Sequence, residues 1–449
     1  MRTKTFLLLA LVAGSVCLAQ TSRPNLSDAR LAPFQLLKAP QPHGLLLREG
    51  DRLAMCGDSI TEQKMYSRLM EDYLTMCVPE LKVSVRQHGW SGERAPGFLG
   101  RMTNDCLRFQ PTITTTCYGM NDHEYRTYED RIGQTYRDNS TAIVEAFKAN
   151  GARVVLGSAG CVGKVPTWQK QTNYTVLELN LNLCQLRNID IDIAKKEHVG
   201  FADVFWPMLT AGVEAQDRYG ANYAIAGHDG VHPGWAGHTV MAYAFLKALG
   251  LKGDIGLFTV DFKRNRMKVS PGHELVSAHD GEFVITSSRY PFCACEPAGQ
   301  AAASYPVCEM DDPARDNSIR SAMTLIPFNQ DLNRLVLKVT NVKAGRSYKV
   351  TWGSESKTFP GAQLERGINL AVEFPSNPFC AAFAKVDAAV AAKQAFETTQ
   401  IKQDFRSPEA KTDMEAVVAR TEKERAPLTE AIPAAFVPVT HTIKIELAK

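Results

Sequence analysis

The chain changes from an apolar strand pattern to a helix pattern at Leu53-Ala54-Met55-Cys56-Gly57-Asp58-Ser59-Ile60-Thr61-Glu62. A serine in such a tight strand-to-helix turn has an exposed hydroxyl, and the N–H groups at the start of a helix favour negative charge. Ser59 is therefore a candidate nucleophile. The alternative is that Asp58 or Ser59 only caps the helix that starts near Lys64.

Short apolar runs alternate with helix patterns between about residues 52 and 250. This alternation predicts an α/β fold with a parallel sheet covered by helices. The expected strands are Arg52–Cys56, Val83–Gln87, Thr112–Tyr118, Arg153–Leu156 and Phe201–Phe205. The segment Val176–Lys195 fits a strand pattern and a helix pattern, and its length favours a helix.

Two further polar blocks follow predicted strands, whose carboxyl ends form the functional crevice of an open α/β sheet. They are Gly89-Trp90-Ser91-Gly92-Glu93 and Gly119-Met120-Asn121-Asp122. A glycine lets a backbone N–H approach a ligand closely, and an asparagine amide can donate to a developing oxyanion. Ordinary turn chemistry is the alternative for either block alone.

A fourth block, Asp229-Gly230-Val231-His232-Pro233-Gly234, stands just before an apolar helix pattern that ends at Gly250. Proline suits the first turn of a helix, which places His232 at a helix entrance. A carboxylate three residues before a histidine can accept Nδ1–H and leave Nε2 to take a serine proton. A capping aspartate beside a surface histidine is the alternative for this pair alone.

In this order the four blocks resemble those of the GDSL/SGNH hydrolase family, over about residues 50–250. The resemblance implies a flavodoxin-like three-layer α/β/α domain, with Ser59 as nucleophile, His232 as general base and Asp229 orienting the histidine. It also implies an oxyanion hole made by the N–H groups of Ser59 and Gly92 and the side chain of Asn121. The chemistry implied is acyl transfer through an acyl-enzyme, which requires no metal and no organic cofactor.

The sequence departs from the family pattern in two places. Ile60 stands where the family name has leucine, and Gln87-His88-Gly89 stands where Asn-x-Gly is common, so Gly89 is an alternative to Gly92. Four residues beside the blocks are candidate substrate contacts: Asp58, Trp90, His123 and Trp235. Packing is the alternative for the two tryptophans, and a solvated loop is the alternative for His123.

Past Gly250 the sequence pattern changes to short strands separated by turns, which predicts further domains. We expect the catalytic domain at 50–252, a β-rich accessory domain at 253–375, and a helical hairpin with a final strand at 376–449. The expected strands are Leu335–Val342, Ser347–Trp352 and Asn369–Phe374, and Thr440–Leu447 is expected to return to the β domain. The hairpin, over about 380–405 and 413–431, either covers the crevice as a lid or packs on the β domain.

The first 19 residues have the pattern of a secretory signal peptide. Arg2 and Lys4 precede an apolar run and small residues that end at Ala19. A lipid anchor at Cys17 is the alternative, although Val16 is larger than the residue expected before a lipidated cysteine. Residues 20–49 read as an extended leader. We therefore expect a periplasmic or extracellular protein, and no later run reaches the roughly 20 apolar residues of a transmembrane helix.

The composition of the chain limits the classes of binding partner that are expected. The formal charge of +3 and the absence of a basic block argue against nucleic acid. An oxidising compartment favours disulfides, and the best candidate joins Cys308 to Cys293 or Cys295. His273-Glu274 and the later His279 superficially suggest a metalloprotease. The two histidines are six residues apart, however, and the helix motif needs a spacing of four, so no metal site is expected.

These observations together predict an exported serine esterase that removes an O-acyl group, specifically O-acetyl, from a carbohydrate. The expected substrate is thus a small-molecule or glycan ester. Two alternatives stay open: a lipid or thioester hydrolase on the same triad, and a catalytically silent glycan-binding protein.

Overall fold

A computed structural model describes residues 28–169, 173–293, 316 and 318–448. The predicted signal peptide, Cys295 and Cys308 lie outside these residues. Across the described helices, none combines the length and apolar composition needed to cross a membrane.

A five-stranded parallel sheet forms the centre of the N-terminal part, with the strand order β2-β1-β3-β4-β5. Its strands are β1 (Arg52–Gly57), β2 (Ser84–Gly89), β3 (Ile113–Cys117), β4 (Arg153–Gly157) and β5 (Gly200–Ala202). Gly57 pairs with Gly89 on one side and with Cys117 on the other, and Cys117 pairs with Gly157. The loops that leave β1, β2 and β3 therefore start at one edge of the sheet. The fifth predicted strand is shorter than expected, because Phe205 already begins a helix.

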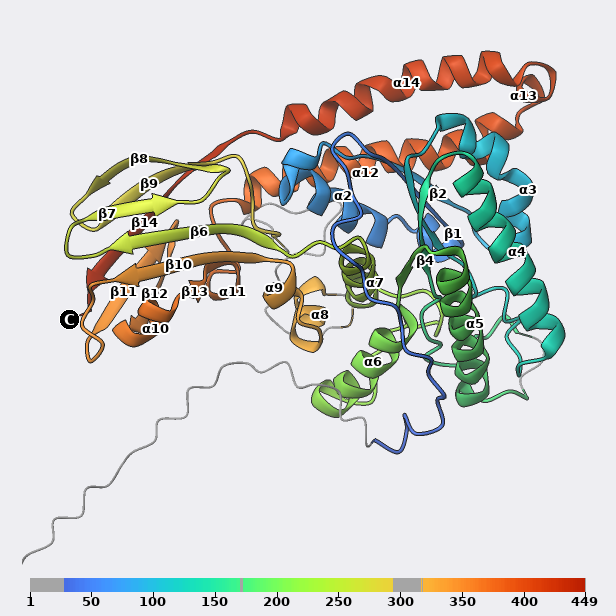
Figure 1. The fold of residues 1–449 in the computed structure, drawn as a ribbon, viewed down its shortest axis with the longest axis horizontal. Helices are drawn as coiled ribbons and strands as arrows, with labels where there is room; N and C mark the ends of the chain where they lie inside the picture. Colours follow the sequence, from blue (N-terminus) through green and yellow to red (C-terminus); the bar gives the residue numbers. More distant parts are fainter. Residues whose placement is uncertain (1–27, 170–172, 294–315, 317, 449) are drawn as a thin grey trace, which may run out of the picture.

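Helices cover both faces of this sheet (Figure 1). They are α1 (Ser59–Glu62), α2 (Tyr66–Met76), α3 (Ala95–Asp105), α4 (Asp130–Ala149), α5 (Val176–Glu197), α6 (Phe205–Tyr219) and α7 (Trp235–Ala248), and short 3-10 turns lie at Pro79–Leu81 and Leu107–Phe109. Both faces of β1 are buried: Met55 packs in the cluster that contains α2 and α7, and Ala54 packs in the cluster that contains α3 and α4. The predicted three-layer α/β/α arrangement is confirmed.

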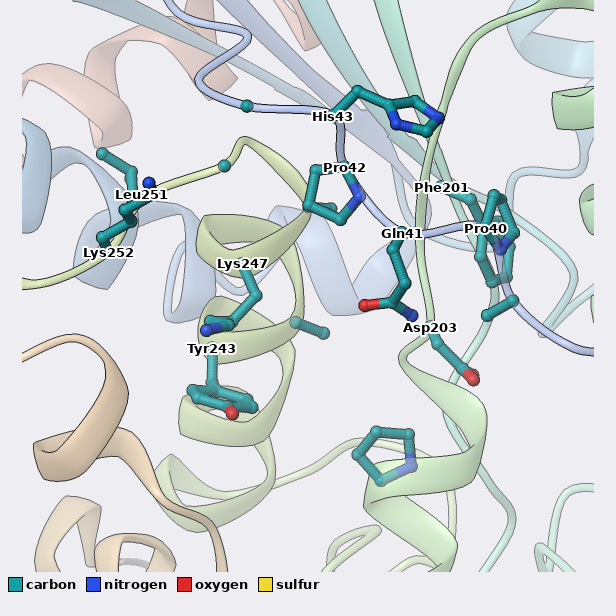
Figure 2. A pocket seen from close by; sticks show the side chains of 16 residues that line it. Pro40, Gln41, Pro42, His43, Phe201, Asp203, Tyr243, Lys247, Leu251 and Lys252 are labelled. Atoms are coloured by element: carbon teal, nitrogen blue, oxygen red, sulfur yellow. The ribbon is translucent and has the colours of Figure 1, made fainter.

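The leader lies against the α/β domain in its described part. The N–H of Leu46 donates to the carbonyl of Leu249 (2.9 Å), and Arg187 donates to the carbonyl of Leu37 (3.1 Å). Between the leader and the end of α7 lies an open hollow of about 670 Å³, which Figure 2 shows with Pro42 and Lys247 on its walls. The leader is therefore part of the packed structure from about residue 28.

Two further sheets form the C-terminal part, with the orders β13-β10-β6-β7 and β12-β11-β14-β9-β8. Their strands are β6 (Asp254–Asp261), β7 (Arg266–Val269), β8 (His273–His279), β9 (Glu282–Ser287), β10 (Arg334–Thr340), β11 (Ser347–Trp352), β12 (Glu355–Pro360), β13 (Ile368–Asn369) and β14 (Val439–Leu447). The last strand returns to the β domain as expected, and it lies between β9 and β11. The strand predicted at 369–374 is wrong. Asn369 accepts a hydrogen bond from the N–H of Ala371 (3.2 Å) and thereby caps a short helix.

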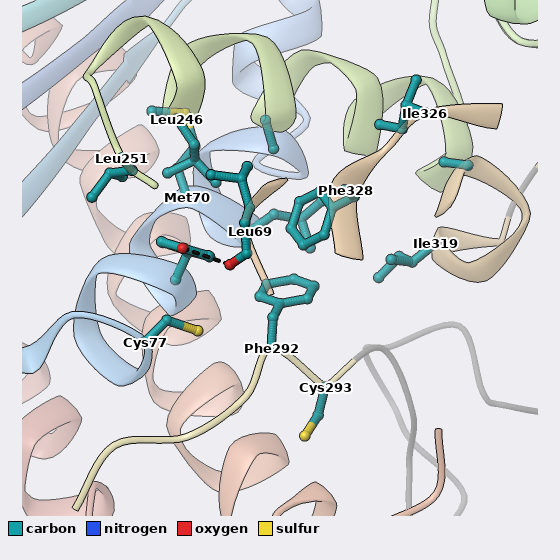
Figure 3. Close-up of a cluster of buried hydrophobic side chains, with 14 of the residues drawn as sticks. Leu69, Met70, Cys77, Leu246, Leu251, Phe292, Cys293, Ile319, Ile326 and Phe328 are labelled. Atoms are coloured by element: carbon teal, nitrogen blue, oxygen red, sulfur yellow. Dashed lines mark hydrogen bonds between the residues drawn. The ribbon is translucent and has the colours of Figure 1, made fainter. Parts of the chain in front are cut away.

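Short helices connect these strands: α8 (Ile319–Leu325), α9 (Phe328–Asp331), α10 (Gly361–Arg366) and α11 (Leu370–Glu373). Figure 3 shows Leu69 and Met70 of α2, Leu246 of α7, Phe292 and Phe328 in one buried cluster. This apolar core runs without a break from the α/β domain into the C-terminal part.

The predicted helical hairpin is present. It consists of α12 (Cys380–Lys402), a 3-10 turn (Asp404–Arg406), α13 (Pro408–Thr412) and α14 (Met414–Ala435). The helix α12 lies along α2 and β2, the edge strand of the parallel sheet (Figure 1). Lys393 and Arg425 donate to the carbonyl of Val85, and Glu397 accepts from the N–H of Gln87 (3.0 Å). The hairpin thus satisfies backbone groups that an exposed edge strand would leave unpaired.

Candidate active site

Ser59, His232 and Asp229 form one hydrogen-bonded chain. Ser59 Oγ lies 2.8 Å from His232 Nε2, and His232 Nδ1 lies 2.7 Å from Asp229 Oδ2. The other carboxylate oxygen of Asp229 accepts from the N–H groups of Val231 (2.9 Å) and His232 (2.8 Å). Burial opposes ionisation of this carboxyl, but the donors from His232 and Val231 outweigh it and lower the pKa of Asp229. The aspartate is therefore held as a carboxylate against the histidine ring.

The loop before α7 gives His232 its position. Gly230 has φ +88°, and a Cβ at this residue would lie 2.3 Å from the carbonyl oxygen of Lys164. Pro233 and Gly234 then lead into α7, which begins at Trp235. A side chain at position 230 would displace this loop, so the glycine allows Asp229 and His232 to share one turn.

The nucleophile candidate is the first residue of α1, directly after the end of β1. Asp58 caps this helix, since its Oδ1 accepts from the N–H of Ile60 (2.9 Å). Asp58 is 2% exposed, and burial raises its pKa to about 7. The candidate role of Asp58 as a substrate contact does not fit this burial. The capping alternative describes its contacts instead.

The two other loops at this edge carry the proposed oxyanion donors. Gly92 has φ +74° in a turn in which the N–H of Glu93 donates to the carbonyl of Trp90 (3.1 Å). Among the residues that the structure describes, the N–H of Gly92 has no hydrogen-bond acceptor. Gly89 ends β2, and a Cβ there would lie 2.2 Å from the backbone nitrogen of Glu62. Gly89 therefore serves close packing, and Gly92 is the better candidate for a loop donor.

The Asn121 amide is oriented by two contacts. Its Nδ2 donates to the carbonyl of Glu93 (3.0 Å), and its Oδ1 accepts from the hydroxyl of Tyr125 (3.2 Å). The Glu93 carboxylate is itself held by Arg101, with N–O distances of 2.6 and 2.7 Å, and by the hydroxyl of Tyr118 (2.9 Å). The loops after β2 and β3 are thus locked to each other.

The other candidate substrate contacts have protein partners. His123 is fully buried, its Nδ1 contacts the carbonyl of Met120, and burial lowers its pKa to about 4. At 0% exposure, the His123 side chain fits neither the predicted substrate contact nor the alternative of a solvated loop. Trp90 and Trp235 are partly buried, and the guanidinium of Arg68 lies 5.8 Å from the Trp235 ring centroid.

Trp168 is a site residue that no sequence motif indicated. Its ring centroid lies 5.8 Å from that of His232 and 6.2 Å from that of Tyr125. Trp168 is 46% exposed, so a large apolar surface borders the histidine. It lies in the loop after β4, and an aromatic residue in a loop after a strand end is the signal that could have identified it.

The cysteines and histidines elsewhere form no second centre in the described part of the chain. The eight described cysteines are free and buried, and Cys293 is one of them, while its proposed partner Cys308 and the alternative Cys295 lie outside the described residues. His273 contacts Ser287 Oγ (2.8 Å) and the carbonyl of Ile255 (3.1 Å). No group of three or more His, Cys, Asp or Glu residues among those described could hold a metal ion.

Comparisons with known proteins agree with this geometry. Residues 55–240 match the model of the GDSL-like Lipase/Acylhydrolase family. No curated protein matches. A gut microbial diltiazem-metabolizing enzyme is similar in structure with a TM-score of 0.70, at 21% identity, covering 91% of this chain and 99% of that chain. This likeness shows that the fold is shared through the C-terminal sheets and helices.

A second solved structure is the acetylxylan esterase Axe2 from Geobacillus stearothermophilus. It is 20% identical, with a TM-score of 0.38, covering 46% of this chain and 98% of that chain. The family match over 55–240 and the ordered loops at the sheet edge lead to one conclusion. Residues 55–240 are similar to the catalytic domains of the GDSL-like Lipase/Acylhydrolase family, and this similarity supports a serine ester hydrolase of the SGNH type.

Proposed function

We propose that this protein is an exported esterase that removes O-acetyl groups from a carbohydrate, with Ser59, His232 and Asp229 as its catalytic triad. The observation that carries the proposal is the unbroken chain of contacts from Ser59 Oγ through His232 to Asp229, at 2.8 and 2.7 Å. The predicted signal peptide supports export.

The geometry supports acyl transfer in two steps. His232 Nε2 takes the proton of Ser59 Oγ as the oxygen attacks the ester carbonyl carbon, and Asp229 stabilises the resulting imidazolium. The N–H groups of Ser59 and Gly92 and the amide of Asn121 stabilise the oxyanion. His232 then protonates the departing alcohol. Water attacks the acyl-enzyme with the same histidine as base, which releases the acid and restores Ser59.

The surface next to His232 supports a sugar as the alcohol part of the ester. The exposed ring of Trp168 borders the histidine, and an indole offers a flat apolar face together with an N–H donor. A pyranose ring has apolar C–H faces and polar edges, which suits such a surface. A lipid hydrolase with the same triad remains the second outcome of the test.

The test is hydrolysis of p-nitrophenyl acetate, butyrate and octanoate, and of acetylated xylo-oligosaccharides. Ser59→Ala and His232→Ala are compared with Ser277→Ala, which removes a hydroxyl from β8 in the C-terminal sheet. We expect Ser59→Ala and His232→Ala to lose activity while circular dichroism is unchanged, and the acetyl esters to be preferred. A preference for octanoate would contradict the carbohydrate substrate. Wild-type activity no higher than that of Ser59→Ala would contradict the triad.

A further inference from the structure

The loop that carries Gly92 is tied to the helix that carries Ser59 through one carboxylate. Glu62, the last residue of α1, accepts a hydrogen bond from the backbone N–H of Ser91. The same carboxylate contacts Lys402 Nζ at 2.6 and 2.8 Å. Lys402 is the last residue of α12, so the C-terminal hairpin reaches this edge of the sheet. Glu62 and Lys402 are partly buried, with side chains 20% and 28% exposed.

The neighbouring Trp90 is held by the same end of the hairpin. Lys402 Nζ lies 5.4 Å from the Trp90 ring centroid, and the guanidinium groups of Arg406 and Arg101 each lie 5.1 Å from it. Arg406 also forms an ion pair with Asp105 on α3 (2.5 Å). Cations over an indole face are attracted to it, so the ring is fixed on the side of the hairpin. This explains the position of Trp90 better than a contact with substrate.

A second chain of contacts runs from α12 to α1. Thr398 Oγ1 donates to Gln87 Oε1 (3.3 Å), and Gln87 Nε2 donates to the carbonyl of Thr61 (2.7 Å). The hairpin thus contacts α1 directly at Glu62 and, through Gln87, at Thr61. Thr61 and Glu62 lie two and three residues after Ser59 in the chain.

We propose that Lys402 is a positioning residue for ester hydrolysis, acting through Glu62 on the loop that presents the Gly92 N–H. This inference rests on the proposed function. Lys402 fixes the Glu62 carboxylate, which fixes the Ser91 N–H and hence the next residue of the loop. Its ammonium also neutralises the carboxylate that accepts from the N–H of Ser91, next to Gly92. An unneutralised Glu62 would oppose the charge that the loop stabilises.

The experiment compares Lys402→Met, Lys402→Arg, Glu62→Gln and the double variant Lys402→Met/Glu62→Gln. Lys411→Met, which removes a lysine from α13 of the same hairpin, is the matched control. The readouts are kcat and KM for p-nitrophenyl acetate and the inhibition constant of phenylboronic acid, which forms a tetrahedral adduct with a nucleophilic serine. Thermal unfolding of each variant reports folding.

Misplacing a catalytic group by about 1 Å costs about 100-fold in rate, and losing an oxyanion donor costs about 100- to 1000-fold. We expect Lys402→Met to lower kcat about 10- to 100-fold with KM within about twofold. The loss of rate is smaller than for a missing oxyanion donor, because the loop is loosened but keeps its N–H. The inhibition constant of the boronate should rise by a similar factor. Lys402→Arg should recover most of kcat, and the double variant should be no worse than Glu62→Gln, because both changes break one contact.

Three outcomes would overturn the proposal. The first is a kcat for Lys402→Met within twofold of that for Lys411→Met. The second is a Lys402→Met variant whose KM rises while its kcat and its inhibition constant for the boronate stay unchanged. The third is a loss in Lys402→Arg as large as in Lys402→Met, at equal melting temperature. If Ser59→Ala is as active as the wild type, the proposed function itself fails, and this result is separate from the comparison of Lys402 with Lys411.

Discussion

Replacing Lys393 by methionine tests how the hairpin is held on the α/β domain. The lysine is 1% exposed, and its ammonium contacts Glu71 at 2.9 Å, Glu397 at 3.1 Å and the carbonyl of Val85. Methionine keeps the apolar stem and removes the charge. Two buried carboxylates then lose a common partner, and breaking a buried ion pair from one side costs about 3–5 kcal/mol.

The pH dependence gives this prediction a sign. Burial raises the pKa of Glu397, but the charges of Lys393, Arg425 and Arg86 outweigh it and lower the pKa from 4.5 to about 2. This carboxylate therefore stabilises the wild type above about pH 4.5, and the stabilisation is lost as the pH falls toward 2. In the variant, the pKa values of Glu71 and Glu397 rise, so the destabilisation is complete at high pH and disappears when both groups are protonated.

Thermal unfolding at pH 8 and pH 4.5, followed by circular dichroism, measures the effect. With about 2 °C per kcal/mol for a large cooperative unit, we expect Lys393→Met to lower Tm by about 6–10 °C at pH 8. The difference should be smaller at pH 4.5. Lys385→Met, at an exposed position of α12, is the control. A shift in Tm no larger than that of the control, or a difference that grows as the pH falls, would contradict the role of Lys393 as the shared partner of Glu71 and Glu397.

Three further predictions concern the site. Asp229→Asn should lower kcat about 10⁴-fold with little change in KM in ester-hydrolysis kinetics, because an amide favours the wrong tautomer of His232; a loss below tenfold would sink this role. Trp168→Ala should raise KM for acetylated xylo-oligosaccharides about tenfold but leave kcat for p-nitrophenyl acetate nearly unchanged, as expected for a ring that binds only the sugar; equal effects on both substrates would argue against stacking. Asp58→Asn keeps an acceptor for the N–H of Ile60 and removes a buried carboxyl whose pKa is raised from 3.8 to about 7. Since ionisation of Asp58 destabilises the fold increasingly between about pH 4 and pH 7, the gain in Tm of this variant should be larger at pH 8 than at pH 4.5; a constant difference would contradict the raised pKa.

The sequence predicted the parts of the fold that depend on local patterns. Apolar runs such as Leu53–Cys56 are buried on both sides in a parallel sheet, so they are recognisable without knowledge of their neighbours. The arrangement of Ser59 and His232 was predictable because both follow from ordered blocks at element ends. The two residues are 173 positions apart in the chain, and only the tertiary fold brings them into contact.

Other features depend on distant contacts and left no local signal. The helix after Asn369 was predicted as a strand, because its apolar residues fit either pattern and the cap decides between them. The hairpin residues Lys393 and Lys402 stand in a helix pattern rich in Ala, Glu and Lys, in which nothing local distinguishes them from the other lysines. Only the tertiary structure shows that one is buried between carboxylates and the other contacts Glu62 beside the nucleophile.

Covalent labelling tests whether Ser59 is a nucleophile that His232 activates. A fluorophosphonate reacts with a serine that a neighbouring histidine activates, and mass spectrometry of the digested protein locates the adduct. We predict one adduct on the peptide that contains Ser59 in the wild type and in Ser277→Ala, and a rate at least about 100-fold lower in His232→Ala, because general-base catalysis contributes about 10²–10⁴-fold. Labelling at another serine, or labelling of Ser59 at an equal rate without His232, would contradict Ser59 as the nucleophile and His232 as its base.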